Sequence, residues 1–238
     1  MKVEGVALGT LIAQYAGLFM AYLLWLRYYR PLRKYISRKQ LFTHDAMKRL
    51  FQVNRDIFLR TLCLVAVTVF FTSTGAAFGD VVLAVNTLLM QLFTLFSYIM
   101  DGFAYAGEAL TGKYIGAGNR QELQRTIRHL FGWGIALSLA FTLLYGIGGK
   151  EFLGLLTNEQ SIISASGDYF YWVLAIPLAG FAAFLLDGIC IGATSTHIML
   201  KAMVVASGSF FLIYYSLHNV LHNHALWLGF FVYLALRG

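Results

Sequence analysis

The sequence is poor in charged residues. Only 12% of its 238 residues are Asp, Glu, Lys or Arg, whereas soluble domains are typically about 25% charged. Such a chain cannot cover a water-facing surface in the usual way, and 59% of it is hydrophobic. The composition therefore excludes an ordinary soluble domain and indicates an integral membrane protein, with the lipid bilayer as its main partner.

Cysteines and sets of catalytic residues are also scarce. The two cysteines, Cys63 and Cys190, lie far apart inside apolar runs, which favours plain buried residues over a disulfide or a metal pair. The sequence has no Ser–His–Asp set, no zinc signature and no basic–aromatic surface for nucleic acid. It therefore predicts neither an enzyme nor a nucleic-acid-binding protein, and it predicts no cofactor.

Long apolar runs dominate what is present. A membrane span needs roughly 20 predominantly apolar residues, and continuous rather than alternating runs argue against strands. No part of the sequence resembles a second, soluble domain. We therefore predict an all-α polytopic membrane protein with about seven transmembrane helices, at about 5–26, 61–79, 81–100 (running on to about 112), 127–148, 168–192, 202–218 and 224–236.

Basic residues are concentrated in alternate connections between these runs. Residues 27–60 contain ten Lys or Arg and residues 113–128 contain four more, whereas 79–81 and 219–224 contain none. By the positive-inside rule, the basic connections are cytoplasmic. The prediction is a multi-pass protein of the plasma membrane whose first residue is exterior and whose C-terminus is cytoplasmic.

The stretch 31–60 mixes basic residues with apolar ones. Thr43 is placed to N-cap a short amphipathic helix that would lie on the inner membrane surface. We interpret the stretch as a positively charged linker between two groups of helices. A regulatory or lipid-sensing site is the alternative interpretation.

Three acidic residues lie within or next to apolar runs. An acid near the middle of a bilayer costs roughly 2.5 to 3.5 kcal/mol on insertion scales, so such residues usually face a cavity, a partner or a pathway. Asp187 follows an almost uncharged run containing Pro177, which tends to bend a spanning helix. Asp101 and Glu108 are seven positions apart. We interpret these acids as candidates for a cation-responsive site. The alternatives are structural hydrogen bonds and, for Glu108, contact with water at the inner end of its helix.

Two further groups of residues suggest sites but have simpler explanations. Gly112, Gly116 and Gly118 lack the spacing of a nucleotide-binding fingerprint, and they predict a tight exit from a helix. The spacing of His218, His222 and His224 suits a metal, but no carboxylate or thiolate accompanies them. Polar residues at the exterior membrane interface are the default prediction for these histidines.

Four stretches of the sequence resemble the DinF-like branch of the multidrug and toxic compound extrusion family. They are "GVALGTLIAQYAGL" (5–18), "NRDIFLR" (54–60), "DGFAYAGEALTGKYIGAGN" (101–119) and "LLDGICIGATST" (186–196). The resemblance implies twelve spans in two six-helix bundles, which export small organic compounds in exchange for protons or sodium across the bacterial inner membrane. On this pattern, residues 1–30 resemble the sixth span, 31–60 form a basic cytoplasmic linker, and 61–238 form the second six-helix bundle.

The resemblance also implies roles for the acids. Asp187 matches the tenth-span acid of the family's second-bundle cation site, with Asp101 and Glu108 assisting it or holding the bundle together. The sequence departs from the family because it lacks the first five spans, has no carboxylate in 61–79, and carries Lys113 where relatives often have Gln. We therefore expect part of a cation-coupled antiporter that needs a missing first bundle or a homodimer partner. The alternative is a stand-alone seven-helix receptor or membrane scaffold without transport.

Overall fold

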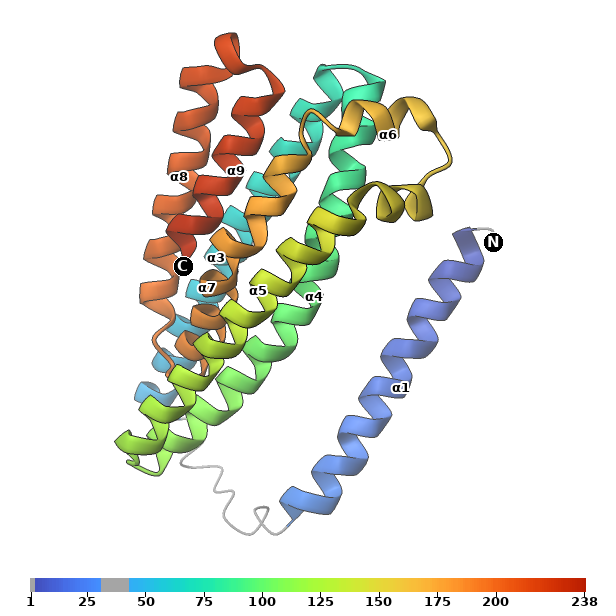
Figure 1. Ribbon diagram of the computed structural model, residues 1–238. Helices are drawn as coiled ribbons and strands as arrows, with labels where there is room; N and C mark the ends of the chain where they lie inside the picture. The colour runs from blue at the N-terminus through green and yellow to red at the C-terminus, as the bar shows by residue number, and fades with distance from the viewer. Residues whose placement is uncertain (1–2, 31–42) are drawn as a thin grey trace. The chain divides into compact units, whose positions relative to one another are not determined.

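The computed structural model describes residues 3–30 and 43–238. The described residues form helices and their connections, and no strand occurs among them, which confirms the all-α prediction. They belong to two compact units, Met1–Gln52 and Val53–Gly238. The helices labelled in Figure 1 are α1 (Val3–Tyr29), α3 (His44–Ala77), α4 (Asp80–Gly116), α5 (Arg120–Leu156), α6 (Gln160–Ser166), α7 (Phe170–Gly192), α8 (Thr196–Leu221) and α9 (Asn223–Arg237).

Six of the described helices are long and apolar enough to cross a membrane, namely α1, α3, α4, α5, α7 and α8. The last predicted span, 224–236, forms α9, which has 15 residues. At 1.5 Å per residue α9 is about 22 Å long, which is shorter than a hydrocarbon core of roughly 30 Å. Six of the seven predicted runs therefore reach spanning length, and the seventh is a shorter helix.

Residues 44–77 form one continuous helix, α3. The helix begins directly after Thr43, where the capping prediction placed a start, but it does not end as a short surface helix. Neither proline nor glycine interrupts 44–74, so no backbone signal separates the basic part from the apolar part. The predicted linker 31–60 thus lies partly within α3, and its residues 31–42 lie outside the described residues.

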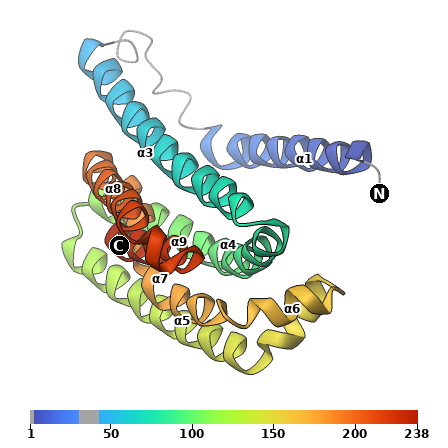
Figure 2. The same cartoon turned by 90° about the horizontal axis from the view of Figure 1, so that it is seen from above.

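In the second unit, α7 is the helix against which α4, α5 and α9 pack. Figure 2 shows α7 between α5 and α9, with α3 along one edge of this bundle. The approach of α7 to α4 is close because Gly188 and Gly192 face the backbone of Ala104 and Glu108. A Cβ atom at either glycine would overlap the facing carbonyl oxygen. Small residues one helical turn apart commonly allow such close packing in membranes.

The helix α3 packs on the bundle mainly through aromatic rings. Phe71 lies against Trp227 and Phe230 of α9, with ring centroids 5.0 and 5.4 Å apart. Phe70 contacts Phe210 of α8 edge to face at 5.8 Å. These rings lie near the middle of the predicted span 61–79, and Cys63, Leu64 and Val67 of α3 also pack in or against the core.

A buried polar network joins α4 to α9 near the same end of the bundle. The side-chain amides of Asn86 and Asn223 donate to each other's oxygens at 2.9 and 3.0 Å. The indole N–H of Trp227 also donates to Asn86 Oδ1 at 2.9 Å. The network satisfies these buried polar groups within the protein, which lipid would leave unpaired.

The connection between α4 and α5 has the geometry predicted from the glycines. The N–H of Asn119 donates to the carbonyl of Tyr114, and the N–H of Gly118 donates to that of Ile115. Gly118 adopts φ 66°, a conformation that favours glycine. The Asn119 side chain then accepts from the N–H of Glu122 at the start of α5. The prediction of a tight helix exit is confirmed.

Candidate functional site

Asp187 is the centre of a buried ion cluster. Its Oδ2 atom accepts hydrogen bonds from the Nη2 atoms of both Arg60 and Arg237. Asp187 is 8% exposed and Arg237 is 9% exposed, and the Arg60 side chain is 16% exposed. The cluster therefore ties three helices, α3, α7 and α9, through one carboxylate.

Arg237 is the more firmly held of the two arginines. It is the last residue of α9, which packs directly on α7. Its guanidinium lies over the ring of Phe184, with Cζ 5.4 Å from the ring centroid. Phe184 is one helical turn before Asp187 on α7, so the ion pair and the cation–π contact act on the same side of that helix.

A small cavity brings the three predicted acids together. It has a volume of about 140 Å³, and its lining includes Asp101 and Glu108 from α4, Asp187 from α7, and the two arginines Arg60 and Arg237. Asp101 and Glu108 share a face of α4 because seven residues are close to two helical turns, roughly 10 Å. Within the described part of the chain, these two acids make no ion pair of their own.

The charges around this cavity do not balance. Its three carboxylates outnumber its two guanidiniums by one. An unbalanced charge is costly in a desolvated site. The two arginines, both bonded to Asp187, therefore leave Asp101 and Glu108 without an ion-pair partner among the residues that line the cavity.

A second cavity adjoins the cluster. It has a volume of about 330 Å³ and shares Arg60, Asp101, Phe184 and Arg237 with the small cavity. The rest of its lining mixes hydroxyl groups with apolar and aromatic side chains: Thr68, Ser97, Tyr233, Leu64, Phe93, Phe230 and Leu234. The ion cluster thus borders a partly polar chamber between α3, α4, α7 and α9.

The sequence did not reveal the two arginines as site residues. Arg60 directly precedes an apolar run and Arg237 directly follows one, and the topology prediction assigned both positions to the cytoplasm. That contiguity was the available signal, since the apolar run begins at Thr61 directly after Arg60. The structure places both guanidiniums inside the bundle, as partners of the predicted acid.

Asp56 is another acid whose burial the sequence did not reveal. It is 5% exposed, and its Oδ2 accepts a hydrogen bond of 3.3 Å from Thr196, the first residue of α8. Arg55 donates to its other oxygen at 3.1 Å. A carboxylate at a helix N-terminus is stabilised by the helix dipole, so Asp56 fastens α3 to the start of α8.

The three histidines do not converge on one point. His224 contacts the hydroxyl of Tyr171 at 3.0 Å, whereas His218 stacks on Tyr214 with ring centroids 5.5 Å apart. His222 has φ 48° at the turn between α8 and α9. Among the described residues, no group of three or more His, Cys, Asp or Glu side chains is arranged to hold a metal ion. Both cysteines are free, and they are half-buried rather than fully buried.

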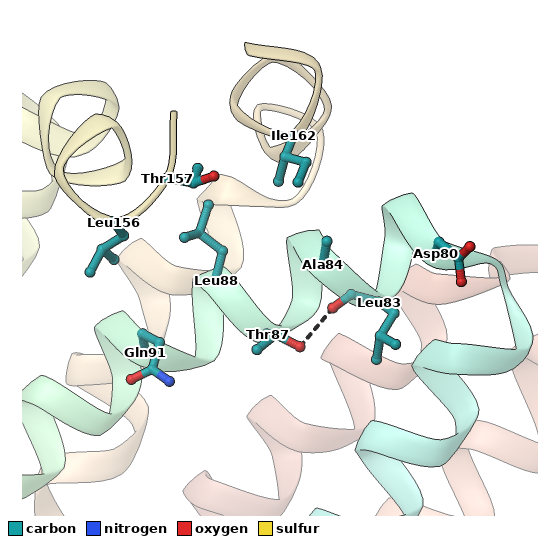
Figure 3. A pocket seen from close by; sticks show the side chains of 9 residues that line it. All are labelled: Asp80, Leu83, Ala84, Thr87, Leu88, Gln91, Leu156, Thr157 and Ile162. Carbon is teal, nitrogen blue, oxygen red and sulfur yellow. Dashed lines mark hydrogen bonds between the residues drawn. The ribbon is translucent and has the colours of Figure 1, made fainter. Parts of the chain in front are cut away.

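A larger cavity lies at the opposite end of α4 from Glu108. Its volume is about 590 Å³, and it is lined by the first turns of α4, the end of α5 and α6. Figure 3 shows Ala84 and Leu88 of α4 facing Thr157 and Ile162 across it, with Thr87 bonded to the carbonyl of Leu83. Asp80 is the single charged residue in its lining. The larger cavity therefore lacks the charge cluster that distinguishes the site around Asp187.

Comparison with known proteins gives a consistent family. The MatE family model matches residues 57–215. The chain is 40% identical over 244 residues to DNA damage-inducible protein F of Escherichia coli (strain K12), covering all of this chain and 52% of that protein. It is 22% identical over 241 residues to Protein DETOXIFICATION 42 of Arabidopsis thaliana, covering all of this chain and 45% of that protein. The chain thus spans about half the length of these curated relatives.

Proposed function

The chain belongs to the MatE family, and we propose that it is part of a cation-coupled exporter of small organic compounds. Its role is transport rather than catalysis, and the exchanged ion is a proton or sodium, with no cofactor. The observation that carries this proposal is the unbalanced cluster of Asp187, Asp101 and Glu108 with two arginines. Acids inside spanning helices generally mark ion or substrate pathways.

The cluster suits an ion-responsive role because it connects separate helices. Asp187 on α7 holds Arg60 of α3 and Arg237 of α9. A proton or cation that neutralises the surplus acid changes the attraction between these helices. A ligand shifts a conformational equilibrium by its different affinities for the two states. In the proposed mechanism, ion binding at Asp187, assisted by Asp101 and Glu108, shifts the bundle between its access states.

A stripe of polar residues along α4 supports the presence of a second helical bundle or a water-lined path beside this helix. The stripe has the three- and four-residue spacing of one helix face, and it consists of Thr87, Gln91, Thr94, Tyr98, Asp101, Tyr105 and Glu108. Tyr98 and Tyr105 are each 71% exposed. Polar side chains along a spanning helix are unfavourable against lipid. The stripe instead fits a water-lined path or a second bundle, supplied by a missing first half or by another copy of the chain.

The helix α1, taken by itself, also fits the presence of further helices. Its described side chains are exposed apart from Leu26, which is half-buried. A helix that is apolar all round normally lies in lipid or inside a helical assembly. This fits the proposal that residues 1–30 correspond to a span preceding the second bundle, while 61–238 form that bundle.

A partner bundle is expected to be necessary for export. In two-bundle transporters the substrate site lies between the halves, and access alternates as one half rocks against the other. Vesicles containing this chain alone should therefore show no dye efflux above empty vesicles, whereas adding a first bundle from a relative should restore efflux. Efflux from the monomeric chain alone would refute this division, so the oligomeric state is measured in the same vesicles.

The proposed location is the bacterial inner membrane, with the first residue exterior and the C-terminus cytoplasmic. The basis is the one-sided distribution of Lys and Arg. A reporter enzyme inserted within 31–60 is expected to be active in the cytoplasm, and one inserted within 219–224 should be active outside. Reversed activities would overturn both this orientation and the assignment of 31–60 as a cytoplasmic linker.

A further inference from the structure

We propose that the Arg60 guanidinium is a tethered cation, which competes with the exchanged cation for the Asp187 carboxylate. This role rests on the proposed function and adds a residue to it. In one state Arg60 occupies the carboxylate, and in the other a proton or sodium ion replaces it. Both occupants carry a single positive charge, so the exchange leaves the charge of the buried site unchanged.

The two arginines share one oxygen of the Asp187 carboxylate. Arg60 and Arg237 both bond to Oδ2, and each does so through Nη2. The Nε atoms of both arginines are buried without a hydrogen-bond partner. A guanidinium pairs best with a carboxylate through two parallel N–H bonds, one to each oxygen. Departure of one arginine would allow the other to form this two-bond pair and satisfy its Nε.

Arg60 is the arginine that is free to leave. Arg237 is held by the Phe184 ring and by the direct packing of α9 on α7. Arg60 is more exposed than Arg237, with side-chain exposures of 16% and 7%. Its helix, α3, runs along one edge of the bundle (Figure 2), whereas Arg237 belongs to α9, which packs on both α7 and α8.

The nearest acid on the helix of Arg60 already has other partners. Asp56, one turn earlier on α3, is already engaged by Arg55 and Thr196, and residues 61–77 contain no acid. The polar groups that line the cavities or lie near the cluster on the other helices are Ser97, Asp101, Tyr105 and Glu108 of α4, Cys190 of α7, and Tyr233 and Arg237 of α9. When Arg60 leaves Asp187, the surplus acids of α4 are the negative charges that remain nearby.

The test is the thermal stability of the purified chain in lipid nanodiscs. The unfolding temperature is measured with rising NaCl at constant ionic strength, using choline chloride as the balancing salt, and separately from neutral to mildly acidic pH. In the unaltered chain Arg60 already supplies the positive charge at Asp187, so the unfolding temperature should rise less than in Arg60→Gln in the same series. In Arg60→Gln the vacated carboxylate binds sodium or a proton, and the unfolding temperature should rise by roughly 5–10 °C near saturation in one series.

Two variants locate this response. Arg128→Gln makes the same substitution at an exposed side chain of α5, and it should behave like the unaltered chain. Arg60→Gln combined with Asp187→Asn should lose the response, because the vacated acid is gone. An Arg60→Gln chain that responds no more than Arg128→Gln overturns the proposal, and so does a double variant that keeps the response.

The yield of folded Arg60→Gln protein gives a second measurement if this variant folds poorly. If the yield of folded protein falls, sodium or acid should restore it, because either one supplies the missing positive charge. A yield that neither condition restores overturns the competition. This experiment does not measure export. If the chain shows the expected response but a completed transporter does not export, the role of Arg60 as a tethered cation stands and the proposed transport function is wrong.

Discussion

Asp187→Asn is expected to lower the free energy of unfolding by about 3–5 kcal/mol, because removing one partner of a buried ion pair leaves the other charge uncompensated. Here two partners are affected, since Arg60 and Arg237 both bond to the same carboxylate oxygen. Asn retains a hydrogen-bond acceptor but carries no charge. Asp101 and Glu108 line the same cavity and offset part of the loss.

The loss is measured by denaturant unfolding in detergent micelles. Asp168→Asn is the matched control, because Asp168 is exposed between α6 and α7 and its change should stay within about 0.5 kcal/mol. Replacing the whole cluster, as Asp187→Leu with Arg60→Met and Arg237→Met, should recover much of the stability, because well-packed apolar residues often replace a buried ion cluster without loss. A loss at Asp187 no larger than that at Asp168 would show that the arginines do not depend on it.

Gly188→Ala is the second large effect, with an expected loss of about 3 kcal/mol from overpacking. The added methyl group would meet the backbone of Ala104 rather than the movable end of a side chain. The helices α4 and α7 would have to separate, and this would displace Asp187, the residue before Gly188, relative to Asp101 and Glu108. Denaturant unfolding measures the loss of stability.

Gly102→Ala provides the control for this prediction. Gly102 lies on α4 with no heavy atom within 4 Å of a Cβ at that position. In the interior of a helix, alanine is favoured over glycine by roughly 0.5–1 kcal/mol, so Gly102→Ala should be neutral or slightly stabilising. Equal effects at the two glycines would mean that the close approach of α4 and α7 does not limit stability.

The sequence was sufficient to predict features that depend on neighbouring residues in the chain. The apolar runs predicted the helices, because a span requires a continuous stretch of apolar residues. Asp187 and Asp101 were recognisable as site candidates because a charged residue inside such a run is costly in lipid and usually faces a cavity, a partner or a pathway. Gly112, Gly116 and Gly118 predicted the tight exit from α4, and Gly118 has the positive φ of that turn.

Features that join distant residues were not predictable in the same way. Arg60 and Asp187 are 127 positions apart, and Arg237 is 50 positions from Asp187. The positive-inside rule already accounted for both arginines as cytoplasmic charges. The local sequence pattern therefore gave no reason to expect a buried acid as their partner. The same holds for Asn86 and Asn223, which are 137 positions apart. The shortness of α9 and the continuity of α3 depend on where helices start, and apolar runs mark these points poorly.

Ion-driven efflux in sealed vesicles shows whether Asp187 couples transport to an ion gradient. The vesicles contain a two-bundle transporter completed with this chain, and dye efflux per folded molecule is measured against imposed proton and sodium gradients. The unaltered chain should give efflux that rises with one of the two gradients, whereas Asp187→Asn should lose that dependence. Efflux by Asp187→Asn with an unchanged dependence on the ion gradient would contradict the account and place the coupling site outside the cluster of Asp187, Asp101 and Glu108.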